Sequence, residues 1–334
     1  MIRTQFESLL KKTNRFARPS FARRQQAKII PGIRVSIGIT CPKFERAGKT
    51  LSGLRDLLPE STVTSDLGSS IPAAVEMAAR ADVVILALGE RQGISGEGFD
   101  RSSLDLPDNQ EQLLEAVVAA GKPVVLVLEN GRPLTIDWAE QHVPAILEAW
   151  YPGEFGGKAV AETLFGDNNP GGKLTITFPR STGQLPDFYN TDPSRVWKYV
   201  DSSGKPLFPF GFGLSYTNFA YERLAVQPPA PGSHDDIHVT VDVTNTGDRA
   251  GDEVAELYVR QNMSSVETPE RALKGFSRIH LQPQETRTVT FLIPQRQLAV
   301  WNAENKWAVE AGRYTVWAGG SSQASLSTEF NLQP

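Results

Sequence analysis

The chain has 334 residues, of which 40% are hydrophobic and 22% charged, and its formal net charge is −4. This length predicts about two domains, and the slightly acidic balance excludes a general electrostatic attraction to nucleic acid or to an anionic membrane. The single cysteine excludes an internal disulfide, the four histidines lack metal-ligand spacing, and no apolar run approaches the roughly 18 residues of a membrane span. We therefore predict no metal, cofactor, nucleic-acid or membrane partner.

The N-terminal segment is strongly basic. Residues 1–28 contain eight basic side chains and one acid, Glu7. No continuous apolar core marks a secretory signal, so a cytoplasmic location is favoured. The composition fits either a transit segment or an adventitious N-terminus on a truncated gene, and we favour the second. Residues 1–45 are assigned as an atypical basic segment, and residues 1–30 are expected to contribute little to the fold.

Helical and strand-like patterns alternate from about residue 70 to residue 180. Helical spacing over 71–81 leads into the apolar run 82–89, whose β-branched residues and final glycine predict a strand buried on both faces. Further helices are predicted over 106–120 and 156–165, and further strands over 122–128 and 145–150. This order predicts an α/β sandwich, an open and mostly parallel sheet flanked by helices, with its site outside the carboxyl ends of the strands.

A different pattern follows residues 227–232, a proline-rich stretch that predicts a semi-rigid linker. Apolar and polar residues alternate over 237–244, and the alternation returns over 254–259, 286–292 and 313–318. Short strands without helical segments predict an all-β sandwich. We expect the α/β domain to span 46–215 and the β domain to span 216–334.

Short motifs occur in a fixed order along the chain. In the first domain they are ADVVILALGE (81–90), SGEG (95–98) with Arg101 and LDLP (104–107), WYPGEFGG (150–157), LFGDNNPGGKL (164–174) and PFGFGLSYT (209–217). In the second they are NTGDRAGDE (245–253), LYV (257–259) and LKGF (273–276). The first set resembles the second domain of family 3 glycoside hydrolases of the β-glucosidase type. The second set resembles the fibronectin type III-like domain that closes many of these enzymes.

The resemblance also implies a part that this sequence lacks. Family members carry an N-terminal (β/α)8 barrel with an aspartate nucleophile in a Ser-Asp-Trp-like motif and a Lys-His pair that binds the sugar. Neither motif occurs here, and the roughly 70 residues ahead of the alternating helix and strand pattern cannot form a barrel of about 250. We therefore expect the nucleophile to lie outside this chain and the chain alone to be inactive. A separate barrel, and an oligosaccharide or aryl glycoside substrate, are the implied partners.

Glu97 is the candidate catalytic residue. Retaining glycosidases use two carboxyl groups, one as nucleophile and one as proton donor. Glu97 follows the predicted strand 82–89 and lies between Gly96 and Gly98, which allow close approach to a ligand. By the resemblance it is the general acid/base, although Gly-Glu-Gly is also the pattern of an ordinary exposed turn. Glu90, at the end of the same strand, is either an alternative acid or the residue that orients the loop.

Four more residues are candidates for substrate binding or loop support: Ser95, Arg101, Trp150 and Tyr151. Arg101 either forms an ion pair, with Glu90 or Asp100, or faces solvent. Trp150 and Tyr151 either stack on a sugar or pack in the core.

Three functions are open at this point. The first is a part of a retaining β-glucosidase that acts on terminal β-D-glucosyl or related residues. The second is a non-catalytic carbohydrate-binding or interaction module, and the third is a nucleotide-binding domain. The absence of a phosphate loop counts against the third, and the Ser-Gly-Glu-Gly motif favours the first over the second.

Overall fold

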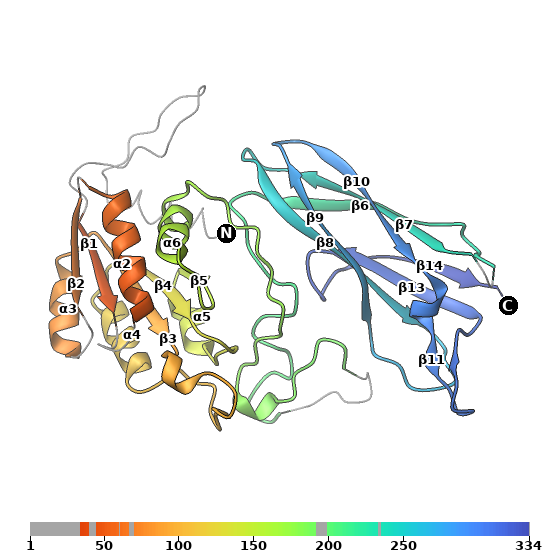
Figure 1. Ribbon diagram of the computed structural model, residues 1–334, viewed down its shortest axis with the longest axis horizontal. Helices are drawn as coiled ribbons and strands as arrows, with labels where there is room; N and C mark the ends of the chain where they lie inside the picture. The colour runs from red at the N-terminus through yellow and green to blue at the C-terminus, as the bar shows by residue number, and fades with distance from the viewer. Residues whose placement is uncertain are drawn as a thin grey trace. The chain divides into compact units, whose positions relative to one another are not determined.

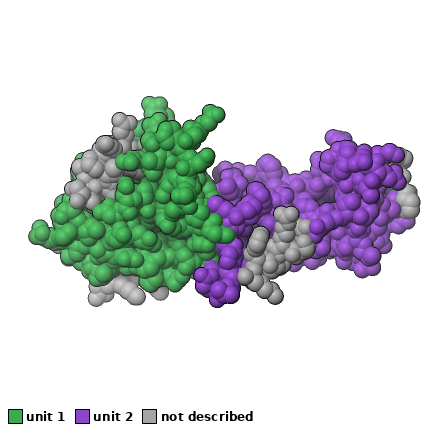
Figure 2. All heavy atoms as spheres, turned by 90° about the horizontal axis from the view of Figure 1, so that it is seen from below, with its two compact units in different colours: residues 1–168, 180–183 green, residues 169–179, 184–334 purple. Residues whose placement is uncertain are grey.

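The computed structural model describes residues 34–39, 45–59, 61–66, 70–191, 199–232 and 235–333. It consists of two compact units (Figure 2). One holds the residues up to Asn168 together with Arg180–Gly183, and the other holds Asn169–Pro179 and the residues from Gln184 onward. The expectation for residues 1–30 falls outside the described residues.

The first unit is built on a parallel sheet. Its elements are β1 (Arg34–Ile39), α2 (Glu45–Leu57), β2 (Thr62–Asp66), α3 (Ile71–Ala79), β3 (Val83–Gly89), α4 (Gln110–Ala119), β4 (Val124–Glu129), α5 (Asp137–His142), β5 (Ala145–Glu148) and α6 (Gly156–Phe165). The strands lie in the order β2-β1-β3-β4-β5, and every neighbouring pair is parallel (Figure 1). The predicted α/β class is confirmed.

The sheet is covered on both faces, which explains the long apolar runs in its sequence. All residues of β3 and β4 are buried. Leu54 of α2 and Val160 of α6 pack with the alternate side chains of these strands in one core. The two helices approach each other so closely at Gly157 that a Cβ there would lie 1.8 Å from the carbonyl oxygen of Lys49, so only glycine fits.

Three boundaries differ from the sequence-based expectation. β1 lies inside the segment assigned as atypical, 1–45, yet pairs with both β2 and β3. α4 begins at Gln110 rather than near residue 106, because Asp108 has a φ of +55° and interrupts helical backbone. β5 ends at Glu148 rather than at Trp150, since Trp150 has a φ of +51°, which lies outside the regular β region.

The second unit contains two antiparallel sheets. Its main strands are β6 (Phe219–Gln227), β7 (Ile237–Asn245), β8 (Gly251–Gln261), β9 (Ala272–Leu281), β10 (Thr286–Ile293), β13 (Gly312–Gly319) and β14 (Leu326–Leu332). The sheet orders are β10-β7-β6 and β14-β13-β8-β9, and a short hairpin joins β11 (Val300–Trp301) to β12 (Trp307–Ala308). Inward residues of both sheets, among them Val241, Leu257 and Val316, form one core. The predicted β-sandwich is confirmed.

The proline-rich stretch is not a linker between domains. Residue 227 ends β6 and residues 228–232 follow it, and β6 pairs antiparallel with β7 in the same sheet. Within the second unit, Lys173 Nζ lies 3.1 Å from Glu253 Oε2, and Tyr221 donates to Glu253 Oε1 at 2.7 Å. This buried pair attaches residues 169–179 to the sandwich. In the described parts of the chain, no helix combines the length and apolar character needed to cross a bilayer.

Candidate functional site

Glu97 lies at the carboxyl edge of the parallel sheet, as predicted. It belongs to residues 91–101, here called the acid loop, which follow β3 and begin with one turn of 3₁₀ helix, Gln92–Ile94. Its side chain is exposed, and among the described residues its carboxylate has no hydrogen-bond or ion-pair partner. Gly96 and Gly98 have φ angles of +152° and +77°. The loop therefore adopts backbone that favours glycine on both sides of the acid.

Glu90 lies beneath the loop and is completely paired. Its side chain is 0% exposed, and Oε1 lies 2.9 Å from Arg101 Nη1 and 3.1 Å from Arg132 Nε. The backbone N–H of Gly131 donates to Oε2 at 3.3 Å. A buried carboxylate needs such partners, because burial removes its hydration. This geometry favours loop support over proton donation as the role of Glu90.

Arg132 holds both ends of residues 94–99, the segment around Glu97 that is here called the arc. Its Nη2 donates to the carbonyl oxygen of Ile94 at 3.0 Å, and its Nη1 donates to that of Phe99 at 3.1 Å. Sequence reasoning did not select Arg132. Its position just after β4 could have indicated that it belongs to the site. β4 neighbours β3, and side chains that follow adjacent parallel strands meet at one edge of the sheet.

Arg101 forms the ion pair with Glu90, one of its open interpretations. Its Nη2 also donates to the carbonyl oxygen of Asp105 at 2.8 Å, which fixes the end of the loop. The Asp105 carboxylate accepts hydrogen bonds from the hydroxyls of Thr135 and Ser103, and these two bonds lower the pKa of Asp105.

Ser95 and Tyr151 meet above Gly131. A Cβ at Gly131 would lie 2.5 Å from Ser95 Oγ and 2.7 Å from the Tyr151 ring, so the two side chains already occupy this space. The Tyr151 hydroxyl also donates to the carbonyl oxygen of Glu90 at 3.4 Å. These contacts support the loop. Sugar stacking by Trp150 or Tyr151 stays a prediction.

Glu148, the last residue of β5, is a further residue of the candidate site that the sequence did not predict. Its Oε1 accepts the backbone N–H of Trp150 at 2.8 Å, and its Oε2 accepts Asn130 Nδ2 at 3.2 Å. Burial raises the pKa of this carboxyl to about 8, so the side chain is mostly neutral at pH 7. Within the described residues, no group of three or more His, Cys, Asp or Glu side chains is arranged to hold a metal ion.

These features define a two-domain protein in which a doubly wound α/β unit presents a carboxylate-bearing loop and a β-sandwich follows. The family model of the glycosyl hydrolase family 3 C-terminal domain matches residues 21–216, and that of the fibronectin type III-like domain matches residues 253–322. The chain therefore belongs to glycosyl hydrolase family 3.

The relatives include enzymes of two sugar specificities. The chain is 45% identical over 257 residues to a beta-xylosidase of Formosa agariphila, covering 76% of this chain and 36% of that protein. It is 38% identical over 327 residues to the periplasmic beta-glucosidase of Salmonella typhimurium, covering 92% and 43%. The crystal structure of a Listeria innocua beta-glucosidase in complex with glucose matches with a TM-score of 0.84 and 30% identity, covering 91% and 46%. The chain thus spans less than half the length of each of these relatives.

Proposed function

We propose that this chain supplies the general acid/base loop of a retaining β-glucosidase-type hydrolase, with Glu97 as the proton donor. The observation that carries the proposal is an exposed carboxylate without a partner among the described residues, held on an arc whose two end carbonyls are fixed by Arg132. A proton donor needs both properties, because it must reach the leaving oxygen and yet start from a defined position.

The nucleophile comes from a barrel domain outside the sequence described. In the first step, the barrel carboxylate bonds to the anomeric carbon while the bond to the leaving oxygen breaks, and Glu97 gives its proton to that oxygen. In the second step, Glu97 takes a proton from water as the water oxygen attacks the same carbon. The bond between this carbon and the barrel carboxylate breaks in the same step, and the sugar is released with its configuration retained.

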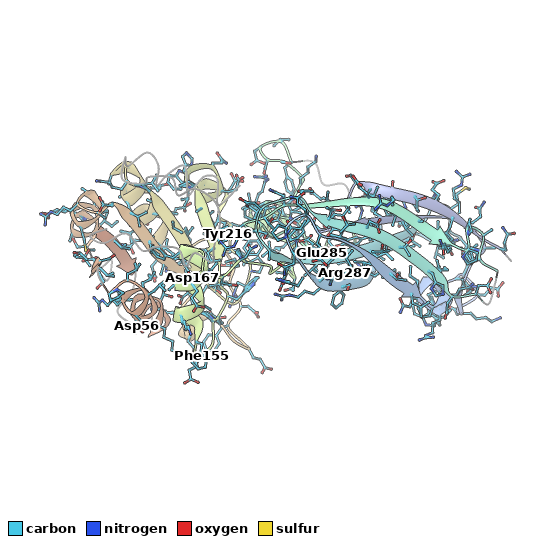
Figure 3. All side chains as sticks on the ribbon, turned by 90° about the horizontal axis from the view of Figure 1, so that it is seen from above. Asp56, Phe155, Asp167, Tyr216, Glu285 and Arg287 are labelled. Atoms are coloured by element: carbon cyan, nitrogen blue, oxygen red, sulfur yellow. The ribbon has the colours of Figure 1, made fainter. Side chains whose placement is uncertain are left out.

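Two exposed aromatic side chains lie in the segments that follow β3 and β5. Phe99, in the acid loop, is 52% exposed. Phe155, in the turn after β5 and labelled in Figure 3, is 74% exposed. Both follow the carboxyl ends of strands. Exposed aromatic side chains beside a candidate site are typical of surfaces that another domain covers.

The test is reconstitution of purified chain with a separately produced family 3 barrel. We expect no turnover by the chain alone and hydrolysis of aryl β-glucosides or β-xylosides by the mixture. Glu97→Gln should reduce turnover by about 10² to 10⁴-fold on substrates with poor leaving groups, and by less on activated aryl glycosides, which need less protonation. Glu115→Gln, the same change at an exposed carboxylate on α4, is the matched control.

Three results would contradict the proposal. Equal losses on activated and unactivated substrates would show that Glu97 is not the acid. Turnover by the chain alone that is lost in Glu97→Gln would place the nucleophile within this sequence. If the chain binds β-linked sugars but never supports turnover with a barrel, the alternative of a non-catalytic carbohydrate-binding module is correct. The cytoplasmic location stays a prediction.

A further inference from the structure

We infer that Glu148 is a positioning residue for the acid loop, which it reaches through Asn130 on one side and through Trp150 and Tyr151 on the other. The inference rests on the proposed function, because the loop matters for catalysis only if Glu97 is the acid. Nothing in the sequence marks Glu148, since a glutamate at the end of a short strand is usually solvated.

The first route passes through one amide. Asn130 Nδ2 has two hydrogens; it donates one to Glu148 Oε2 at 3.2 Å and the other to the carbonyl oxygen of Arg132 at 2.9 Å. Asn130 Oδ1 is buried and accepts no hydrogen bond from the described residues, so these two bonds alone orient the amide. Arg132 in turn holds the carbonyl oxygens of Ile94 and Phe99. Removing the Glu148 acceptor therefore loosens the residue that fixes the arc around Glu97.

The second route passes through the backbone after β5. Trp150 has a φ of +51°, a left-handed conformation that is unfavourable for a residue with a side chain. The bond from its N–H to Glu148 Oε1 stabilises this turn. The turn directs the Tyr151 ring against Ser95 and Gly131, and the Tyr151 hydroxyl to the carbonyl of Glu90. Both routes thus end in the acid loop.

The charges around Glu148 explain why a neutral acid suits this place. Glu90 is paired with Arg101 and Arg132. Buried Glu129, on neighbouring β4, accepts a hydrogen bond from the hydroxyl of Thr50 at 2.8 Å. No arginine or lysine is among the groups that shift the pKa of Glu148. An ionised Glu148 would add an uncompensated charge to this cluster, whereas the neutral acid keeps its acceptor oxygens. Glutamine, which is neutral and retains one carbonyl oxygen, is its closest mimic.

The experiment is hydrogen exchange on the full chain, read at the hydrogen-bonded amides of Ile94, Ser95 and Phe99 and expressed as protection relative to intrinsic rates. Glu148→Ala should lower protection by about tenfold or more, because two buried donors lose their acceptor. Glu148→Gln keeps an acceptor oxygen for one of the two donors and should lower protection by less than Glu148→Ala does. Wild-type protection should fall as the pH rises through 8, where Glu148 ionises, and that of Glu148→Gln should not.

Two further variants complete the experiment. Glu154→Ala, an exposed neighbour in sequence, should leave exchange unchanged. Asn130→Ala interrupts only the first route and should also lower protection, which provides a second test if Glu148→Ala does not fold. Unchanged protection in either folded variant, or equal damage by Glu148→Gln and Glu148→Ala, overturns the inference. Because the readout involves no turnover, it separates this inference from the role of Glu97, which the leaving-group test decides independently.

Discussion

Removing the Glu90 carboxylate should destabilise the α/β unit more than any single change within the acid loop. The Glu90 side chain is 0% exposed, and those of its partners Arg101 and Arg132 are 19% and 20% exposed. Breaking a buried pair from one side costs about 3–5 kcal/mol, because the remaining charge stays buried without a partner. Both arginines retain some access to water, so we expect the lower end, about 3 kcal/mol, for Glu90→Ala.

Calorimetry tests this value. For a unit of this size, about 3 kcal/mol corresponds to a fall of about 6 to 12 °C in the melting temperature. Glu97→Ala is the matched control in the same loop and should change stability by less than about 0.5 kcal/mol, because its carboxylate has no described partner. In a double-mutant cycle, Glu90→Ala and Arg132→Ala should couple by about 1–3 kcal/mol. A loss below about 1 kcal/mol for Glu90→Ala, or no coupling, would refute the view that this pair holds the loop.

Three further predictions concern backbone and burial. Gly98→Ala should cost about 1 kcal/mol in urea unfolding because its φ is +77°, whereas Gly93→Ala, with no positive φ and nothing within 4 Å of its Cβ, should be close to neutral. Gly157→Ala should cost about 3 kcal/mol or more, since the added Cβ meets the carbonyl oxygen of Lys49 at 1.8 Å; retention of the wild-type melting temperature would show that the helices separate freely. Because burial raises the pKa of Glu148 to about 8 from 4.5, the stability it contributes is full below about pH 4.5 and is lost as the pH rises through about 8. Glu148→Gln should therefore gain stability over wild type across this range, with a ceiling of about 5 kcal/mol, and parallel pH profiles of the two proteins would contradict this.

The fold was predictable where local pattern and burial agree. β3, β4 and α6 were expected almost residue for residue, because apolar runs ending in glycine or in a polar turn describe a covered parallel sheet. β1 was missed because its residues 34–39 follow a basic segment and are defined by pairing with two strands that lie later in the chain. The predicted helix start near residue 106 was wrong because no local sequence pattern indicates the positive φ of Asp108.

The candidate site was predictable only in part, for a related reason. Glu97 could be placed by its loop alone, and Glu90 by the end of its strand. Arg132 and Glu148 follow other strands, and they reach the loop only because β4 and β5 lie beside β3 in the sheet. Their contacts depend on strand order, which the sequence pattern does not specify. The raised pKa of Glu148 depends on burial, and that burial also follows from how the strands and helices pack.

In the acid loop, some residues are held by hydrogen bonds, whereas Glu97 is exposed. The carbonyl oxygens of Ile94 and Phe99 are held by Arg132, so the ends of the arc are fixed before any partner arrives. Glu97 itself remains exposed and flanked by glycines. Ordering one residue costs about 1–2 kcal/mol, and a loop with fixed ends limits that cost to the few residues between them. A domain that covers this edge would therefore need to order only the centre of the arc. The final position of Glu97, the proposed proton donor, would then be set by that domain together with the Glu90 and Arg132 pair. Under the proposal, a defect in either should lower turnover without unfolding the chain's sandwich.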